Sequence, residues 1–305
     1  MLWIVGSCNV DLTVNVESFP AAGETVLARE SSLSIGGKGA NQAVAAALWN
    51  VKPRFIGCVG NDPWGKRVCQ ELSRYGLDVS LITVSESHPT GIAWIEIDEK
   101  GNNRITVAAG ANFDLSADQV LGNLAGLTSR DYLLSQLEVP LQTVESAFEY
   151  AKDKGAKTLL NPSPCVGRLN RLFSLTDYLV LNERECCKLA AVSSFFDEKE
   201  KAKSFFFQWG ISVLVVTTGA SGAFVFEQGG SINHILPPVV QVVDSSGAGD
   251  AFLGTFAAWI ESGKTLEEAL RAATVSGSLA CTRRGTMSSF PQAQDVLLQL
   301  SKTPL

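Results

Sequence analysis

Histidine is almost absent from this chain. Among 305 residues only His88 and His234 occur, and neither lies in a glycine-rich or acidic cluster. This scarcity argues against a Ser/His/Asp or Cys/His catalytic group and against a metal cage built from imidazoles and thiols. We therefore expect both histidines at the surface or in loops, and carboxylates to carry any acid–base chemistry.

Paired cysteines and long apolar runs are also lacking. The seven cysteines are odd in number, show no CxxC spacing, and lie mostly in apolar stretches where a thiol packs as a small hydrophobic group. We expect free thiols and a cytoplasmic location. The start, MLWIVGSCNV, has no basic segment and is interpreted as a first strand, not a signal peptide. No run approaches the roughly 18 apolar residues that a membrane helix needs, so no membrane partner is expected.

Positive charge is in the minority. The formal net charge of −6 argues against nucleic acid or an anionic membrane as a partner, whereas 46% hydrophobic residues predict a sizeable core. An acidic protein that binds a phosphate compound must do so at a local site. Backbone amides, a few lysines or arginines, and a metal ion could supply it.

The apolar pattern alternates between strands and helices. Strands are predicted at 2–6, 54–59, 131–137, 157–160, 178–181 and 212–217. Helices are predicted at 39–49, 64–75, 116–126, 140–154, 183–191, 198–209, 250–262, 266–281 and 292–301. This alternation predicts one α/β domain, residues 1–305, with a mostly parallel sheet covered by helices on both faces. Residues 12–35 and 90–108 alternate as strands without a helix between, and DEKGN reads as a hairpin turn, so they predict a small projecting sheet, a lid.

The segment VVQVVDSSGAGDAFLGTFAAW, residues 239–259, joins three patterns. Its valines predict a strand over 239–243, its serines and glycines a turn, and the spacing of Phe252, Phe256 and Trp259 a buried helix. A glycine turn that leads into a helix leaves N–H groups free to bind an anion. Asp250 would then be an acid beside an anion site, an arrangement that suits phosphoryl transfer.

Two further stretches carry polar groups at glycine turns or strand ends. In SIGGKGANQAVAAAL, Lys38 could meet phosphate and Asn41 a hydroxyl; the alternative is a plain turn with a solvent-facing lysine. In VGSCNVDLTV, Asn9 and Asp11 point the same way from an extended backbone and suit a vicinal diol. The alternative there is local bonding to the backbone of a turn.

Asn161 and Asn182 each end an apolar strand, where ligands bind in open α/β sheets. Asn182 with Glu185 also matches a helix N-cap and its capping box, which leaves open whether Glu185 additionally orders metal-bound water. Two nucleotide signatures fail. ESGKTLEE has Ala258 where a P-loop needs glycine, and the GxGxxG pattern fails at Phe252.

Together these stretches resemble the ribokinase-like, or PfkB-type, sugar kinases along nearly the whole chain. The resemblance rests on GSCNVDLTV, SFPAAGETV, GGKGANQAVAAA, TGIAWI, AAGAN, QLEVPL, LNPSP, NERE, TTGASGA, DSSGAGDAF and TRRGT. It implies a three-layer αβα sandwich with a β-sheet lid, and a homodimer formed through the lids. It also implies transfer of phosphate from ATP, with Mg²⁺, to a sugar hydroxyl, most closely the 5-hydroxyl of D-ribose, with activation by K⁺.

The resemblance also assigns roles. Asp250 would accept the hydroxyl proton, and the backbone of Gly247, Ala248 and Gly249 would form an anion hole. Sugar contacts would come from Asn9, Val10, Asp11, Gly37, Lys38, Gly39, Ala40, Asn41, Ala93, Ile95, Glu138 and Asp250, with Asn9 and Asp11 on the 2- and 3-hydroxyls. The nucleotide would meet Asn182, Thr217, Thr218, Gly219, Ala220, Ser221, Gly222, Gly249 and Thr274. K⁺ would be held by Asp244, Ser246, Ala280, Arg283, Gly285 and Ser289, and Mg²⁺ by Glu185 through water.

Three alternatives stay open. One is a kinase of the same family for 2-deoxyribose, fructose or a nucleoside such as adenosine. Another is a sugar-binding regulator without activity, although the complete GAGD turn, Lys38 and NERE argue against it. A hydride-transfer oxidoreductase lacks its dinucleotide fingerprint.

Overall fold

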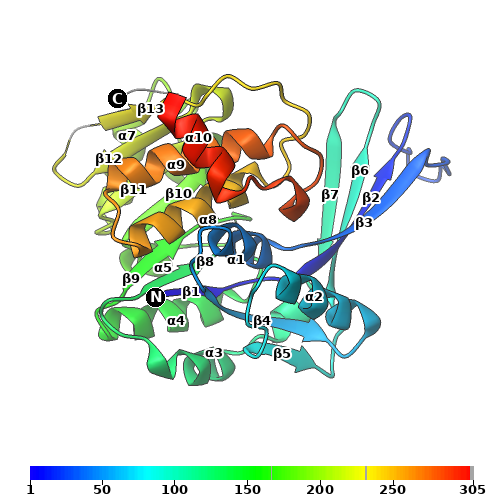
Figure 1. The fold of residues 1–305 in the computed structure, drawn as a ribbon, viewed down its shortest axis with the longest axis horizontal. Coiled ribbons are helices and arrows are strands. Elements are labelled where there is room, and N and C mark those ends of the chain that lie inside the picture. Colours follow the sequence, from blue (N-terminus) through cyan, green and yellow to red (C-terminus); the bar gives the residue numbers. More distant parts are fainter. Residues whose placement is uncertain (166, 231, 303–305) are drawn as a thin grey trace.

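A nine-stranded sheet forms the centre of the molecule (Figure 1). This computed structural model describes residues 1–165, 167–230 and 232–302. The strand order is β13-β12-β11-β10-β9-β8-β1-β4-β5, parallel except that β12 and β13 run antiparallel to their neighbours. The bounds are β1 (Leu2–Val5), β4 (Arg54–Gly60), β5 (Ile82–Ser85), β8 (Tyr132–Ser135), β9 (Lys157–Leu160), β10 (Tyr178–Asn182), β11 (Val213–Thr217), β12 (Ala223–Glu227) and β13 (Ile232–Ile235).

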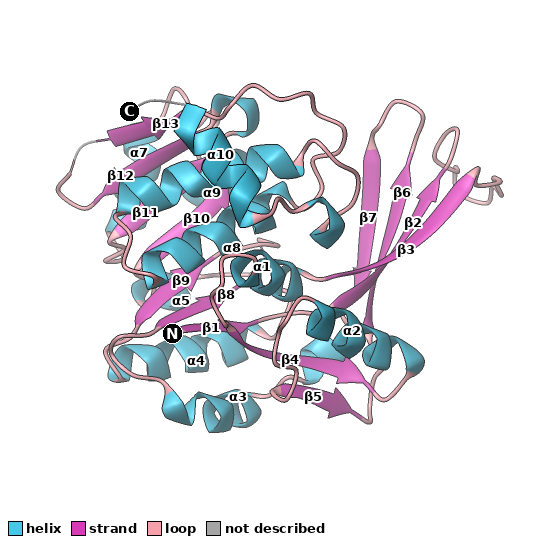
Figure 2. Ribbon diagram, viewed as in Figure 1, coloured by secondary structure: helices cyan, strands magenta, loops and turns pink. Residues whose placement is uncertain are grey.

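Helices cover both faces of this sheet (Figure 2). In β1, Leu2 and Ile4 enter one core cluster and Trp3 and Val5 the other, because successive strand residues point to opposite faces. The first cluster holds side chains of α1 (Lys38–Ala47), α2 (Pro63–Arg74), α8 (Ala248–Glu261) and α9 (Leu266–Ala280). The second holds side chains of α3 (Ala117–Asn123), α4 (Leu141–Asp153), α5 (Asn170–Ser174), α6 (Glu183–Ala190) and α7 (Lys199–Phe207), while α10 (Ala293–Lys302) packs on α9. The predicted three-layer αβα architecture is confirmed.

A second, four-stranded sheet projects from one side of the molecule (Figure 2). Its order is β3-β2-β6-β7, with β2 (Asn9–Asn15), β3 (Glu30–Gly36), β6 (Gly91–Ile97) and β7 (Asn103–Ala108). The β6–β7 turn is the predicted hairpin, in which Asp98 accepts hydrogen bonds from Lys100 and Asn102. The small projecting sheet expected from residues 12–35 and 90–108 is therefore confirmed, and we call it the lid; that it closes over a ligand stays a prediction.

The strand predicted over 239–243 is wrong. These residues form no strand, and Val239, Val242 and Val243 are exposed. The backbone N–H groups of Val243 and Asp244 donate to the Cys281 carbonyl at the end of α9, at 2.8 and 3.2 Å, which ties this segment to a helix and not to the sheet. Conversely, β5, β12, β13 and α5 were not predicted, because their short patterns did not stand out from turns.

Other expectations hold within the described residues. All seven cysteines are free. No helix in the described part of the chain combines the length and apolarity required to cross a membrane. The His88 side chain is exposed, and His234 lies in β13 stacked on Phe224. Thr265 and Glu268 form a capping box at the start of α9, so the P-loop-like stretch only connects two helices.

Helices α1 and α8 lie against each other without intervening side chains. A Cβ atom at Gly254 would stand 2.5 Å from both the Ala45 Cβ and the Gln42 carbonyl oxygen, closer than real contacts permit. Alanines at 43, 45 and 46 give α1 a matching flat surface. This close approach brings the first turn of α1 beside the first turn of α8.

We expect Gly254→Ala to destabilise the protein by about 1–3 kcal/mol, because the added methyl group overpacks the α1–α8 contact. Urea unfolding measures the change. Gly122→Ala is the matched control: Gly122 is also helical, but a Cβ there meets nothing within 4 Å. That control should be neutral or slightly stabilising, by up to about 1 kcal/mol. Equal losses in both variants would contradict the close-packing argument.

Candidate active site

The start of α8 is built as an anion site. Gly247 occupies the N-cap position with a left-handed φ of 74°, and no side chain caps the helix. A Cβ at Gly247 would stand 3.0 Å from Phe290 and 3.2 Å from Thr286, so both conformation and space require glycine. The Ala248 N–H makes a long bond, 3.3 Å, to the Ser245 carbonyl. Uncapped N–H groups and the positive end of the helix dipole thus favour negative charge at this turn.

Asp250 lies in the first turn of α8 and is 8% exposed. One carboxylate oxygen accepts a hydrogen bond from the Asn41 amide at 2.9 Å, and the other accepts one from Gln42 at 2.8 Å. The Gln42 side-chain oxygen in turn accepts from the Gln136 amide. Burial raises the pKa of Asp250, although nearby Lys38 and the two amides oppose the shift. The carboxylate is therefore fixed in orientation and more basic than a carboxylate in water.

Lys38 begins α1 opposite this carboxylate. Burial would lower its pKa, but Asp250, Glu138 and Glu185 more than offset that effect, so the pKa is raised and the side chain stays charged. Glu138 accepts hydrogen bonds from the Lys38 backbone N–H at 3.1 Å and from the Ser7 hydroxyl at 2.6 Å. A lysine surrounded by acids can balance the charge of an incoming phosphate.

Gly37, with φ 92°, precedes Lys38 and passes within van der Waals distance of the β1–β2 connection. A Cβ there would stand 2.8 Å from the Asn9 nitrogen and the Cys8 Cα, so only glycine fits. Gly39 and Ala40 are buried at the start of α1. The glycines of this stretch therefore serve close packing of α1 against the chain that carries Asn9.

Asn9 and Asp11 lie on one face of the lid, as their spacing predicts. In the parallel β2–β6 register Asp11 pairs with Ala93 and Thr13 with Ile95, so these side chains share that face. Both Asn9 and Asp11 are buried, whereas Val10 turns to the opposite side and joins the core. The structure thus brings four of the sequence-predicted sugar residues together on one face, Asn9, Asp11, Ala93 and Ile95, but not the Val10 side chain.

Asp11 accepts no hydrogen bond from any residue that the structure describes. Burial, followed by the charges of Glu138 and Asp250, raises its pKa to about 7. A Cβ at Gly36 would collide with this carboxylate, so the neighbouring strand leaves room only for glycine. Among the described residues, the Asp11 carboxylate consequently has no hydrogen-bond partner, and it lies on the inner face of the lid, where a polar ligand could bind it.

A cavity of about 230 Å³ opens beside Asp250. It reaches the ends of β10 and β11, where Asn182 and Thr217 are register partners. Its lining consists of Lys38, Asn161, Ser163, Val180, Leu181, Asn182, Glu185, Thr217, Gly247, Gly249, Asp250, Phe252 and Leu253. The cavity lies beyond the carboxyl ends of parallel strands, the usual position for ligands in this kind of sheet.

Asn182 and Glu185 form the helix cap that the sequence predicts and also line the cavity, while the ordering of metal-bound water by Glu185 stays a prediction. They form a reciprocal capping box at the start of α6, with bonds of 2.9 and 3.0 Å. Both also line the cavity, and the charge of Glu185 contributes to the raised pKa of Lys38. Capping positions this carboxylate at the cavity wall instead of excluding it from a ligand site.

Other predicted nucleotide residues lie outside the cavity lining. Residues 218–222 form a turn after β11, closed by the Thr218 N–H donating to the Gly222 carbonyl at 2.7 Å, and residues 219–221 of this turn are exposed. Thr274 is buried in α9, and its hydroxyl has no hydrogen-bond partner among the residues that the structure describes. The turn leads directly from Thr217, which does line the cavity.

The predicted cation-site residues converge in part. Asp244 accepts hydrogen bonds from the backbone N–H groups of Ser246 and Gly285, both at 2.9 Å, which joins the segment before α8 to the segment after α9. Burial acts to raise the pKa of Asp244, but these hydrogen bonds outweigh that effect, so the pKa is lowered. Ser289 is fully buried and donates to the Thr286 carbonyl at 2.8 Å. Ala280 is the last residue of α9, and Arg283 lies just after this helix. The Arg283 side chain points toward Asp295, at 3.9 Å.

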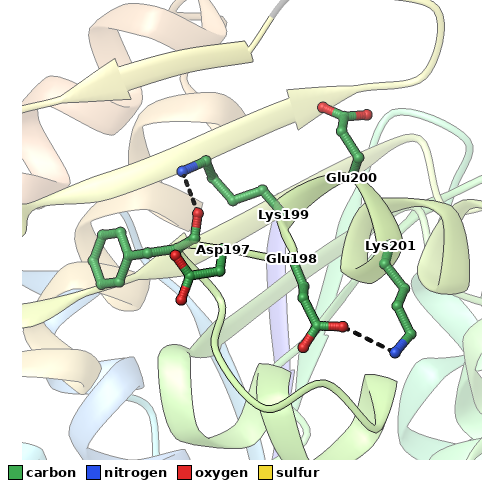
Figure 3. A pocket seen from close by; sticks show the side chains of 6 residues that line it. Asp197, Glu198, Lys199, Glu200 and Lys201 are labelled. Atoms are coloured by element: carbon green, nitrogen blue, oxygen red, sulfur yellow. Dashed lines mark hydrogen bonds and ion pairs between the residues drawn. The ribbon is translucent and has the colours of Figure 1, made fainter.

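A second surface hollow lies away from the predicted site. It has a volume of about 410 Å³ and is lined by six consecutive residues, Phe196 to Lys201, at the start of α7 (Figure 3). Lys201 pairs with Glu198, and Lys199 donates to the Phe196 carbonyl, so these charges are satisfied within the segment. None of the predicted site residues lines it.

Three buried amides of the site were missed from the sequence. Gln42 and Gln136 support Asp250, and Asn112 contacts Asn9. All three lie in stretches that carry the family resemblance, GGKGANQ, QLEVPL and AAGAN. The polar residues in those stretches were the available signal, but their partners are 94 to 208 residues away in sequence.

The chain is similar in sequence and in structure to a known family of enzymes. Residues 1–293 match the family described as pfkB family carbohydrate kinase. Ribokinase of Haemophilus influenzae is 37% identical over 297 residues, which cover 97% of each chain. Deoxyribokinase of Salmonella typhimurium is 32% identical over 293 residues, covering 95% of each chain. The structure of Arabidopsis thaliana ribokinase complexed with ribose and ATP superimposes with a TM-score of 0.88 at 30% identity, covering 99% of both chains.

The raised pKa of Asp11 makes stability depend on pH. Between about pH 4 and pH 7 the folded chain retains a proton at Asp11 that the unfolded chain releases, so stability falls as pH rises through this window. Relative to Asp11→Asn, we expect the stability of the wild type to decline by at least about 1.4 kcal/mol between pH 4 and pH 7, the energy equivalent of one pKa unit. Above about pH 7 the difference in stability should stay constant. Urea unfolding at several pH values measures the gap.

Asp98→Asn is the control for this experiment. The pKa of Asp98 is lowered, chiefly by its hydrogen bond from Asn102, so the stability that this carboxylate contributes is fully present above about pH 4 and is lost only at lower pH. The stability difference between wild type and Asp98→Asn should therefore stay constant from about pH 4 to pH 7. A gap between wild type and Asp11→Asn that does not change with pH would show that Asp11 titrates normally.

Proposed function

This chain belongs to the pfkB family of carbohydrate kinases, and we propose that it is an ATP-dependent kinase of the 5-hydroxyl of D-ribose. The observation that carries the proposal is the position of Asp250. Its buried carboxylate lies in the uncapped first turn of α8, held by two amides and neighboured by a charged lysine. A base, an anion site and a cation thus converge on one cavity, as phosphoryl transfer requires.

The chemistry follows from this arrangement. Asp250 accepts the proton of the sugar hydroxyl as the hydroxyl oxygen bonds to the terminal phosphorus of ATP and the bond to ADP breaks. Backbone N–H groups of residues 247–249 stabilise the negative charge on the transferring group, and the Lys38 ammonium adds to that stabilisation. The raised pKa of Asp250 suits proton acceptance, because it reduces the difference in pKa between the Asp250 carboxyl group and the sugar hydroxyl.

The sugar is proposed to bind under the lid. Asn9 and Asp11 face the 2- and 3-hydroxyls, Glu138 and the start of α1 hold the other side, and Ala93 and Ile95 cover the ring. Within the described part of the chain the buried Asn41 side-chain oxygen has no hydrogen-bond partner, which leaves an acceptor for a sugar hydroxyl. A sugar without the 2-hydroxyl would leave a buried polar group unmatched, at a cost of about 1–3 kcal/mol.

ATP is proposed to enter along the ends of β10 and β11. Asn182, Thr217 and Gly249 line this part of the cavity, and the turn 218–222, exposed at residues 219–221, follows directly after Thr217. A ribokinase of the same fold was solved with ribose and ATP, which supports nucleotide binding here. Glu185 at the cavity wall would hold Mg²⁺ through water, and the bound ion would neutralise phosphate charge.

Potassium is proposed to bind behind the anion site. Asp244, the hydroxyls of Ser246 and Ser289, and the carbonyls of Ala280, Arg283 and Gly285 would hold it. The donor set fits a hard cation. Thr286 lies against Gly247, and its buried hydroxyl has no hydrogen-bond partner among the described residues. A bound cation would strengthen the positive field at the turn that receives the phosphoryl group.

Two further proposals concern the setting of the enzyme. We propose a homodimer through the lid, because Trp94, Ile105 and Val107 expose apolar surface on that thin sheet. We also propose a cytoplasmic location for the whole single-domain chain, since all seven thiols are free. A lid-mediated dimer would cover the exposed strand edges and faces.

ADP release measured with D-ribose, 2-deoxyribose, fructose and adenosine at matched concentrations tests the substrate. With Mg²⁺ and K⁺ present, we expect kcat/KM to favour D-ribose over 2-deoxyribose by about 5-fold to 150-fold, equivalent to 1–3 kcal/mol. Replacing K⁺ with Na⁺ should lower the rate. Equal efficiency for ribose and 2-deoxyribose would contradict the sugar assignment, and no turnover of any sugar would favour a sugar-binding regulator.

A further inference from the structure

Asn112 occupies the junction between the lid and the main sheet. It lies in the short 3-10 helix η1 (Gly110–Asp114) that follows β7, and it is 1% exposed. Its side chain joins this segment to the start of β2, where Asn9 leaves the main domain. Gly91 at the start of β6 completes the junction, since a Cβ there would collide with the side chains of both Asn112 and Asn9.

The hydrogen bonds of Asn112 allow only one orientation of its amide. The side-chain oxygen accepts from the Cys8 backbone N–H at 2.8 Å. The NH₂ group faces three acceptors: the carbonyls of Cys8 at 3.1 Å and Ala109 at 3.0 Å, and the side-chain oxygen of Asn9 at 2.7 Å. A reversed amide would set oxygen against two carbonyls and NH₂ against an N–H group, so the backbone fixes the direction.

This fixed donor determines the orientation of Asn9 as well. Because the Asn112 NH₂ group points at Asn9, the Asn9 oxygen must face Asn112 and its own NH₂ group must face away. Among the described residues, that NH₂ group has no hydrogen-bond partner, and Asp11, two residues along the same face, has no donor. The lid therefore presents one outward donor beside one outward acceptor.

We propose that Asn112 is a positioning residue of the sugar site, which holds Asn9 as a hydrogen-bond donor and so sets selectivity for a sugar with a 2-hydroxyl. The proposal rests on the proposed sugar kinase function. A donor from Asn9 and an acceptor from Asp11 match two neighbouring hydroxyls, each of which can accept one hydrogen bond and donate another. Without Asn112, the Asn9 amide can rotate and present either its NH₂ group or its oxygen to the sugar. Only a fraction of the molecules then offers the hydrogen-bond donor that the 2-hydroxyl needs.

The test compares D-ribose with 2-deoxy-D-ribose for wild type, Asn112→Ala, Asn9→Ala and the double variant, at saturating ATP. We expect Asn112→Ala to lower kcat/KM for ribose about threefold to tenfold, the effect of one oriented hydrogen bond, mainly through KM. The preference over 2-deoxyribose should shrink by a similar factor, with KM for ATP unchanged. In the Asn9→Ala background, Asn112→Ala should not change the preference further, because its effect acts through Asn9.

Thr90→Ala is the matched control for a purely structural role. Thr90 is equally buried at the lid base, and its side chain hydrogen-bonds Gly60 and Asp62 instead of a proposed sugar residue. We expect this variant to lose stability and keep the sugar preference. If it lost the preference as Asn112→Ala does, or if the effects at 9 and 112 were additive, the proposed role of Asn112 would be wrong.

Asn9→Asp provides a second test that leaves Asn112 in place. The new carboxylate keeps the acceptor that Asn112 binds and replaces the outward NH₂ with oxygen. Ribose efficiency should fall at least as far as in Asn9→Ala, and near wild-type efficiency would overturn the donor assignment. A wild-type enzyme that phosphorylates no ribose would instead contradict the proposed function, which separates the two failures.

Discussion

The rest of the site depends on the contact between the first turns of α1 and α8. This contact places the amides of Asn41 and Gln42 on the two oxygens of Asp250, and Gly254 lets the helices approach closely enough for those bonds. A buried carboxylate would otherwise be costly, because it has left water without gaining partners. The same packing brings Lys38 beside the acid and leaves the N–H groups of α8 free for an anion.

The lid supplies the second half of the site through a different kind of constraint. Asn9 and Asp11 leave the main domain on a strand whose base is held by Asn112, and β6 pairs with that strand so that Ala93 and Ile95 face the same side. The catalytic half is thus rigid because two helices interlock, and the binding half is rigid at its base, where backbone and side-chain amides meet. A sugar between the two halves would be held by both.

Much of this arrangement was predictable, because it depends on local patterns. Periodicity gave the helices and the parallel strands, and the spacing of Asn9 and Asp11 gave their shared face. The valines at 239–243 were misleading, since β-branched residues favour extended backbone but cannot by themselves secure a place in a sheet. Gln42, Gln136 and Asn112 could not be found in the same way. Their roles depend on partners that only the fold brings near, and a buried glutamine looks no different in sequence from an exposed one.

Whether Asp250 receives the proton of the sugar hydroxyl is decided by the variant Asp250→Asn. Calorimetric ribose binding and steady-state turnover should be measured on the same preparation. We expect kcat to fall by about 10²–10⁴-fold while the Kd for ribose stays within a few-fold of the wild-type value. The reason is that the amide keeps the shape of the site but cannot take the proton. An unchanged kcat would show that the proton leaves by another route and would contradict the account.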